Sequence, residues 1–298
     1  MNGSKNKARL VLMPCLFGST YVTAVEVNLQ PRLNTGPMYY EFEQEAQFKF
    51  IVPDPENNPT GVVAFGPSSK VSFSDVMPFV GGGATLFIER FFIDAYAQAA
   101  FDGEDQDTLQ RVPSIFNNDF ENRQISRKWD RQEYSFSAGY ALTDSFALFA
   151  GYRFSRTDFE DRTTVFDIGS QETSVEDISL DYEQDGPFIG GSYQVPVNQG
   201  KYLDGSIGLN LGIAFVDGKI KQTLNGEGLE DITGDTVGVT LGLAWKGRIT
   251  NRWSYLIGVD GYRFEFEADQ TVSDPGDIQG ADFSETVVRG TFGLSYLF

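Results

Sequence analysis

The chain is poor in the residue types that carry most enzyme chemistry. It contains no histidine and a single cysteine, Cys15, among 298 residues. Without an imidazole, the sequence cannot build a histidine base for a serine or water, nor a histidine-liganded metal site. Carboxylates and basic side chains remain, and the fold must bring them together. The search for function therefore depends on which elements position those charges.

Residues 1–24 have the pattern of a secretory signal peptide. They begin with the basic residues Lys5, Lys7 and Arg9, continue with an apolar stretch that contains the cysteine, and end in small residues. Removal of this segment leaves 20 basic and 42 acidic residues, a formal charge of −22. Such an acidic chain excludes nucleic acid as a partner. No cofactor is predicted, and no metal can be assigned.

Beyond residue 24, apolar residues recur at every second position. From Ile207 to Phe215 the odd positions are large and apolar, and the residues between them are glycine, asparagine or alanine. No stretch reaches the roughly 18 apolar residues that a membrane-spanning helix needs. The alternating segments predict ten strands, at 36–52, 74–88, 91–102, 130–142, 145–157, 182–195, 202–216, 235–247, 252–266 and 285–298. The first segment is acidic, so eight strands with a separate N-terminal segment is the alternative.

The predicted connections alternate in length. Short ones cover 89–90, 143–144, 196–201 and 248–251, and long ones cover 53–73, 103–129, 158–181, 217–234 and 267–284. Short turns at one end and long loops at the other are typical of outer-membrane barrels. The residues between the large apolar ones are small, which suits the crowded interior of a narrow barrel. A closed barrel also leaves no unpaired strand edge in lipid. We therefore predict an all-β fold for residues 25–298, a single closed antiparallel transmembrane β-barrel with short periplasmic turns and long extracellular loops.

The last predicted strand gives the most specific pattern. Phe292, Leu294, Tyr296 and Phe298 share one face, and the chain ends in an aromatic residue. This strand resembles the C-terminal signature of bacterial outer-membrane barrel proteins, which the barrel assembly machinery recognises. The resemblance implies an outer-membrane location, with lipid and lipopolysaccharide around the barrel. Barrel enzymes of that class resemble one another in using a histidine, so the resemblance and the missing histidine together predict that this chain is not an enzyme.

Charged residues on the predicted inner face are the remaining site candidates. They are Glu41, Glu43, Glu45, Lys49, Asp94, Glu133, Arg153, Lys246, Asp260 and Arg289. Buried charges must be paired or hydrated. The tight turn at 143–144 places Glu133 almost opposite Arg153, which predicts a cross-strand ion pair. Closure between the first and last strands is expected to bring Arg289 near Glu45 and Asp260.

The long loops carry most of the negative charge, with 24 acidic and 8 basic residues in total. Asp102, Glu104, Asp105 and Asp107 form the densest group, a candidate for divalent-cation binding by carboxylate oxygens. The group lacks the spacing of an EF-hand, and well-hydrated loops are the alternative explanation. The first hypothesis for function is a non-catalytic barrel with a structural or surface-interaction role, and the second is a narrow channel for small solutes or ions.

Overall fold

A computed structural model describes residues 27–54, 58–65, 69–113, 120–167, 171, 173–198, 204–228, 232–268 and 278–298. The predicted signal peptide lies outside these residues. The strands of the described part are β1 (Val27–Asp54), β2 (Asn58–Phe65), β3 (Ser69–Ile88), β4 (Phe91–Pro113), β5 (Phe120–Ala141), β6 (Phe146–Asp167), β7 (Thr173–Asn198), β8 (Asp204–Leu224), β9 (Glu227–Gly228), β10 (Ile232–Arg248), β11 (Trp253–Ala268) and β12 (Ile278–Tyr296). Within the described residues, no helix has the length and apolar character needed to span a membrane.

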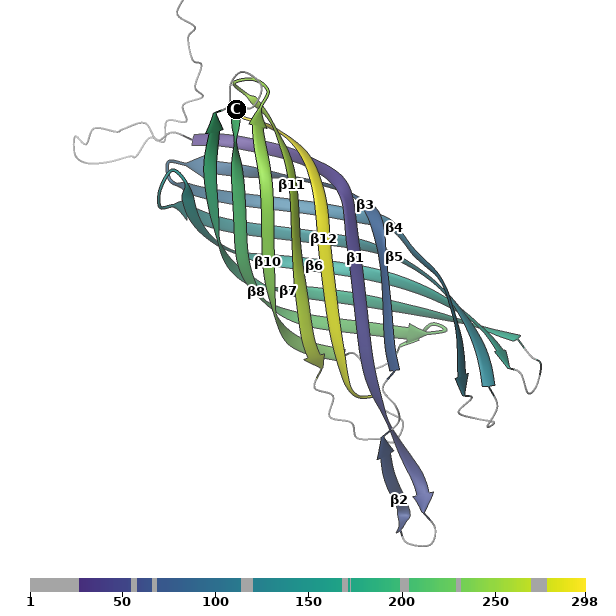
Figure 1. Cartoon of the computed structure of the whole chain (residues 1–298). Coiled ribbons are helices and arrows are strands. Elements are labelled where there is room, and N and C mark those ends of the chain that lie inside the picture. Colours follow the sequence, from purple (N-terminus) through teal and green to yellow (C-terminus); the bar gives the residue numbers. More distant parts are fainter. Residues whose placement is uncertain are drawn as a thin grey trace, which may run out of the picture.

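Ten of these strands form a closed antiparallel barrel (Figure 1). The order around the wall is β1, β3, β4, β5, β6, β7, β8, β10, β11 and β12, and β12 pairs with β1 to complete the circle. β2 extends the end of β1 as a hairpin, and β9 pairs with the end of β8. The prediction of ten strands is confirmed, and the eight-stranded alternative is wrong.

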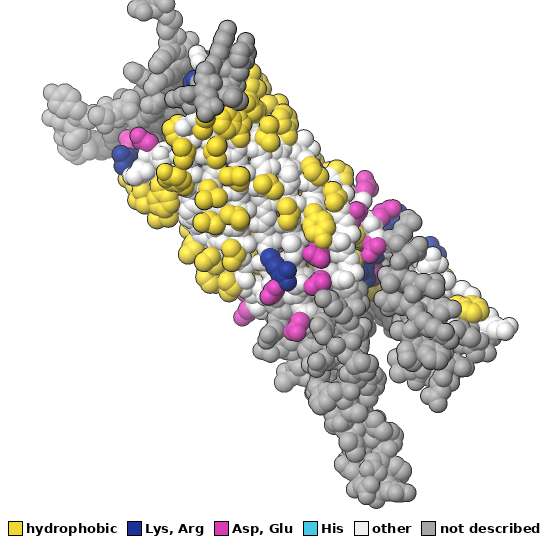
Figure 2. Space-filling view, in the orientation of Figure 1, with side chains coloured by type: hydrophobic (Ala, Val, Ile, Leu, Met, Phe, Trp, Pro, Cys, Tyr) yellow, Lys and Arg dark blue, Asp and Glu magenta, His cyan; other side chains and the backbone are white. Residues whose placement is uncertain are grey.

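The outer surface of the barrel carries an apolar belt (Figure 2). Alternation along β10 shows its origin, because Val237, Val239 and Leu241 point outward and are more than half exposed. Gly238, between the two valines, and Gly242, directly after Leu241, point inward and are buried. Exposed apolar side chains on this scale would be a liability in water, whereas lipid solvates them. The belt therefore marks the membrane-spanning part.

The two ends of the barrel differ. The C-terminus lies beside the short turns, since Leu297 N–H donates to the carbonyl of Arg252 and Phe298 N–H to that of Leu29. β2 and the strand ends that lead into the long connections lie at the other end (Figure 1). In outer-membrane barrels the first strand begins, and the last strand ends, on the periplasmic side. In that orientation the long connections lie on the extracellular side.

The strands extend far into the segments predicted as long loops, so those loop boundaries were wrong. β4 and β5 reach Pro113 and Phe120, although a loop was expected over 103–129. Above the membrane both strand faces contact water or packed side chains, so the lipid-facing alternation ends while backbone pairing continues. Backbone pairing therefore extends the strands, and some directly opposed residues carry opposite charges, for example Lys128 and Glu104 at 2.9 Å.

The turn between β8 and β9, above the membrane, has a sequence typical of a β-hairpin, which the prediction missed. Asn225 and Gly226 both have positive φ, 50° and 85°, and they connect β8 to β9. Asn-Gly is the favoured pair for a two-residue hairpin turn of this kind. At the other end of the chain, β1 begins at Val27, nine residues before the predicted start at 36. Pro31 and Pro37 interrupt its β pattern without preventing pairing with β3.

Candidate functional site in the barrel interior

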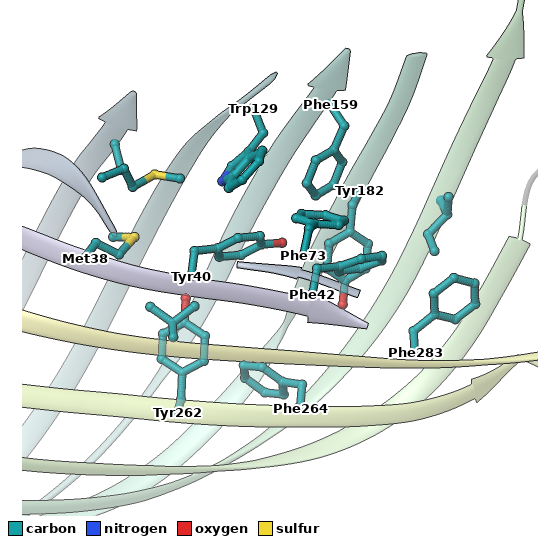
Figure 3. Packing of buried hydrophobic residues seen from close by; sticks show 14 of the residues in the cluster. Met38, Tyr40, Phe42, Phe73, Trp129, Phe159, Tyr182, Tyr262, Phe264 and Phe283 are labelled. Carbon is teal, nitrogen blue, oxygen red and sulfur yellow. The ribbon is translucent and has the colours of Figure 1, made fainter. Parts of the chain in front are cut away.

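Aromatic side chains pack against one another in one part of the barrel interior (Figure 3). The buried rings are those of Tyr40, Phe42, Phe73, Trp129, Phe159, Tyr182, Phe264 and Phe283, which we call the aromatic plug. The Phe42 ring of β1 lies 5.3 Å from the Tyr182 ring of β7, which is on the opposite wall. Trp129 of β5 lies 5.0 Å from Phe73 of β3. The plug therefore spans the bore.

A layer of charged residues lies directly below the aromatic plug. Arg131 of β5 and Glu285 of β12 are 1% and 0% exposed and form an ion pair at 2.5 Å. Tyr262 of β11 donates a hydrogen bond of 2.9 Å to Glu133 of β5, and Arg131 donates one of 2.7 Å to Tyr262. These contacts join opposite walls of the barrel, because β5 and β11 are separated by four strands on either side. We call this group, with Arg153, Asp260 and Arg289, the charged layer.

The structure brings two of the predicted pairs together. Arg153 Nη2 lies 3.7 Å from Glu133 Oε1. Their backbones are diagonal rather than opposed, since Glu133 is paired with Ser155. Asp260 and Arg289 are directly opposite on β11 and β12, and the arginine Nε donates to the carboxylate at 2.8 Å.

The expected approach of Arg289 to Glu45 was wrong. The register of β12 with β1 places Arg289 opposite Met38, whereas Glu45 is opposite Asp282. Instead, Arg289 Nη1 lies 3.6 Å from Glu133 Oε1 across the bore. Strand counting failed here because it ignored the stagger that barrel closure imposes on neighbouring strands.

The predicted inner face of β1 was also wrong. Met38, Tyr40 and Phe42 point inward and are buried, so Glu41 and Glu43 lie on the outer face. The prediction assigned polar residues to the interior along the whole strand. Above the belt the polarity reverses, because there the interior holds the aromatic plug and the outer face contacts water. The side chains of Glu45 and Lys49 lie outside the described part.

Arg131 and Glu285 are the two charged members of this layer that sequence reasoning missed, and Tyr262, which joins Arg131 to Glu133, was not singled out either. Both share the parity of residues that were assigned to the interior, Glu133 on one strand and Arg289 on the other. Both also lie at the edge of their predicted strands. Alternation along the strand, which predicted that Glu133 and Arg289 face inward, also predicts that Arg131 and Glu285 face inward.

The interior near the short turns is polar and partly hollow. Arg32 of β1 forms two hydrogen bonds to Asp94 of β4, at 2.6 and 2.8 Å, and a third at 2.9 Å to Thr85. A cavity of about 270 Å³ lies between this pair and the charged layer. Its lining includes Arg32, Asn34, Tyr96, Asn210, Asp260 and Arg289. Two further cavities, of about 400 and 480 Å³, lie at the turn end of the barrel.

The predicted cation-binding group lies on strand β4 rather than in a loop. Asp102 has a φ of 61° and its N–H donates to Asp130, while Glu104 is ion-paired with Lys128. Asp105 is opposite Arg127 in the β4–β5 register, and the side chain of Asp107 lies outside the described part. The described residues contain no group of three His, Cys, Asp or Glu side chains placed to hold a metal ion. Cation binding here stays a prediction.

A row of acidic residues follows the outer face above the belt. Asp217 of β8 is directly opposite both Asp185 of β7 and Asp235 of β10. Farther around the wall, Asp282 of β12 is also exposed on the outer face. Like charges facing each other across strands are unfavourable by roughly 0.2–1 kcal/mol per pair. Many acids that were assigned to loops therefore lie on the strand walls.

Phe292, Leu294 and Tyr296 of the predicted assembly signal lie on the outer face of β12, and Phe298 follows the end of that strand. Phe292, Leu294 and Phe298 are exposed to the lipid side, and the Tyr296 ring packs 5.1 Å from Trp253 and 4.7 Å from Phe298. This arrangement agrees with the expected face. Recognition by the assembly machinery stays a prediction.

No protein-family model matches the chain, and no curated protein matches it. Among solved structures, the outer membrane protease OmpT from Escherichia coli is similar, with a TM-score of 0.56 at 11% identity over 91% of this chain and 97% of that one. The translocator domain of autotransporter NalP from Neisseria meningitidis gives 0.38 at 12% identity over 88% of each chain. OprG from Pseudomonas aeruginosa gives 0.31 at 10% identity over 74% of this chain and 95% of that one.

The closed antiparallel wall, the apolar belt and the likeness of fold to OmpT define the class of fold: it is a transmembrane β-barrel of the kind found in the bacterial outer membrane. At these identities the likeness concerns the fold alone. The activities in the names of the similar proteins are not carried over to this chain.

Proposed function

We propose that this protein is a non-catalytic, sealed barrel that displays an acidic surface outside the membrane and does not conduct solutes. The observation that carries this proposal is the set of contacts across the bore. The charged layer joins opposite walls through Tyr262 and Glu133, and the aromatic plug joins them again through Phe42 and Tyr182.

Passage of a solute would require both layers to separate. Opening the charged layer would leave Glu285 or Arg131 buried without its partner, and an uncompensated buried charge costs several kcal/mol. Opening the plug would expose packed aromatic surface to water. Both penalties oppose a conducting state.

The arrangement of the inner carboxylates supports a non-catalytic role. Glu133, Asp260 and Glu285 are each ion-paired with an arginine, and the aromatic plug lies above them. Carboxylate catalysis needs one acid and one base that face a common substrate pocket. In the described residues these carboxylates are instead committed to the arginines.

The acidic row gives the barrel a surface for contacts outside. Hard divalent cations prefer carboxylate oxygens, and a cation held between this row and lipopolysaccharide phosphates would relieve the repulsion between the aspartates. Lipopolysaccharide is therefore the proposed partner of this surface.

Single-channel recording in planar bilayers tests the sealed state. We expect wild type, Arg153→Ala and Arg289→Ala to be silent, because the aromatic plug remains in all three. Arg156→Ala is the matched control, since Arg156 lies on the outer face and is 40% exposed. Insertion is checked by the heat-dependent shift in gel mobility. Stable steps in wild type, with a selectivity that changes in Arg153→Ala but not in Arg156→Ala, would establish a channel and overturn the proposal.

A further inference from the structure

Most charges inside the barrel are matched by a partner of opposite sign. The charged layer pairs its arginines with carboxylates, and Arg32 is paired with Asp94. Lys246 of β10 is the exception among the described interior residues. Its Nζ donates a hydrogen bond of 3.2 Å to the side-chain carbonyl of Gln30, and no ion pair to a described carboxylate accompanies it.

The surroundings of Lys246 are donors and hydroxyls. Gln30 Nε2 donates to Ser295 Oγ at 3.0 Å, and the Ser254 and Ser295 hydroxyls lie 2.7 Å apart. The cavity of about 480 Å³ at this end is lined by Lys246 together with Gln30, Ser206, Ser254 and Arg252. Its described lining contains no carboxylate. Ammonium, amide and hydroxyl groups in one cavity can all donate to an anion.

Lys246 is half-buried and has no counter-charge among the described residues, which is unfavourable, and a bound anion would remove that cost. Because the short turns face the periplasm, the cavity opens to that side. We propose that the periplasmic mouth of the barrel binds a small free oxyanion, a carboxylate or a phosphate, with Lys246 as the principal cation. The charged layer above prevents the anion from crossing, so the site is a blind pocket rather than part of a pathway.

Titration calorimetry of the refolded full chain in neutral detergent tests this site. Inorganic phosphate and acetate are the probes, at constant ionic strength, and their relative affinities distinguish phosphate from carboxylate. We expect saturable binding at one site in wild type and an affinity at least tenfold lower in Lys246→Gln. Lys128→Gln is the matched control, because Lys128 is 64% exposed on the outer face, and we expect no change.

A second measurement needs no variant at Lys246. Trp253 lines the same cavity, so iodide that concentrates near Lys246 should quench tryptophan fluorescence more than the neutral quencher acrylamide does. Added phosphate should displace the iodide and remove this additional quenching. Absence of saturable binding in wild type, equal binding by Lys246→Gln, or quenching by iodide that phosphate does not affect would each overturn the proposal.

Discussion

Replacing Arg131 by methionine is the sharpest perturbation of the charged layer. The substitution keeps a long apolar stem but leaves Glu285, which is fully buried, without its ion-pair partner at 2.5 Å. It also removes the hydrogen bonds from Arg131 to Thr157 and Tyr262. Removal of one partner from a buried ion pair costs about 3–5 kcal/mol. We expect the free energy of unfolding to fall by that amount.

A double variant separates the charge effect from lost packing. Replacing both partners of a buried pair by apolar residues is often neutral, so Arg131→Met with Glu285→Leu should recover most of the loss. Urea unfolding in phospholipid vesicles, followed by tryptophan fluorescence, measures both variants. Lys128→Met is the control, because its ion pair with Glu104 is exposed and is worth less than about 1 kcal/mol. A loss below 1 kcal/mol in Arg131→Met, or a double variant as unstable as the single one, would refute the reasoning.

Three further predictions concern the plug and the outer face. Phe42→Ala removes a buried ring that contacts Phe73, Phe159 and Tyr182, and should lower the free energy of unfolding by about 3–5 kcal/mol in the same urea assay. Asp217→Asn removes repulsion with Asp185 and Asp235, so it should raise that free energy by roughly 0.2–1 kcal/mol per relieved pair. Added Mg²⁺ should stabilise wild type more than this variant, and equal stabilisation would argue against cation binding by the row. Burial raises the pKa of the Asp181 carboxyl above its ordinary value of 3.8, against the lowering effect of Arg156, so as the pH falls the carboxylate is protonated in the folded state before it is protonated in the unfolded state. The ionised Asp181 side chain should therefore lower the free energy of unfolding above the pKa that it has in the folded state, and this loss should disappear below pH 3.8. Unfolding measured from pH 7 to pH 3 should show a wild-type gain that Asp181→Asn lacks, and parallel profiles would contradict the assignment.

The membrane-spanning fold could be predicted because lipid imposes a simple rule on each strand. Large apolar residues such as Val239 and Leu241 must face outward, and the residues between them must be small or polar. That rule identified all ten strands of the barrel. The rule does not apply above the membrane, because no lipid contacts the strands there. It therefore does not predict the extensions of β4 and β5.

The interior could be predicted only in part, because its polarity changes along the axis. Tyr134 and Phe136 are large and face outward, so alternation along the strand correctly predicted that Glu133 faces inward. On β1 the prediction assigned the acidic positions to the interior, and this was wrong for Glu41 and Glu43. The inward face of β1 at that height is aromatic, and alternation alone does not say which of two faces is inside. The neighbour of Arg289 depends on the stagger of β12 against β1, which no local pattern encodes.

Thiol accessibility from the two sides tests the central claim, a barrel sealed to the outside. The predicted mature chain has no cysteine, so Asn34→Cys places a single thiol in the cavity below the charged layer. Ser126→Cys, on the outer face of β5, and Asp144→Cys, in a short turn, report the two sides. In proteoliposomes with one orientation, a small charged thiol reagent should reach Asn34→Cys only from the side that labels Asp144→Cys. Labelling of Asn34→Cys from the side that labels Ser126→Cys, at a similar rate, would contradict the account.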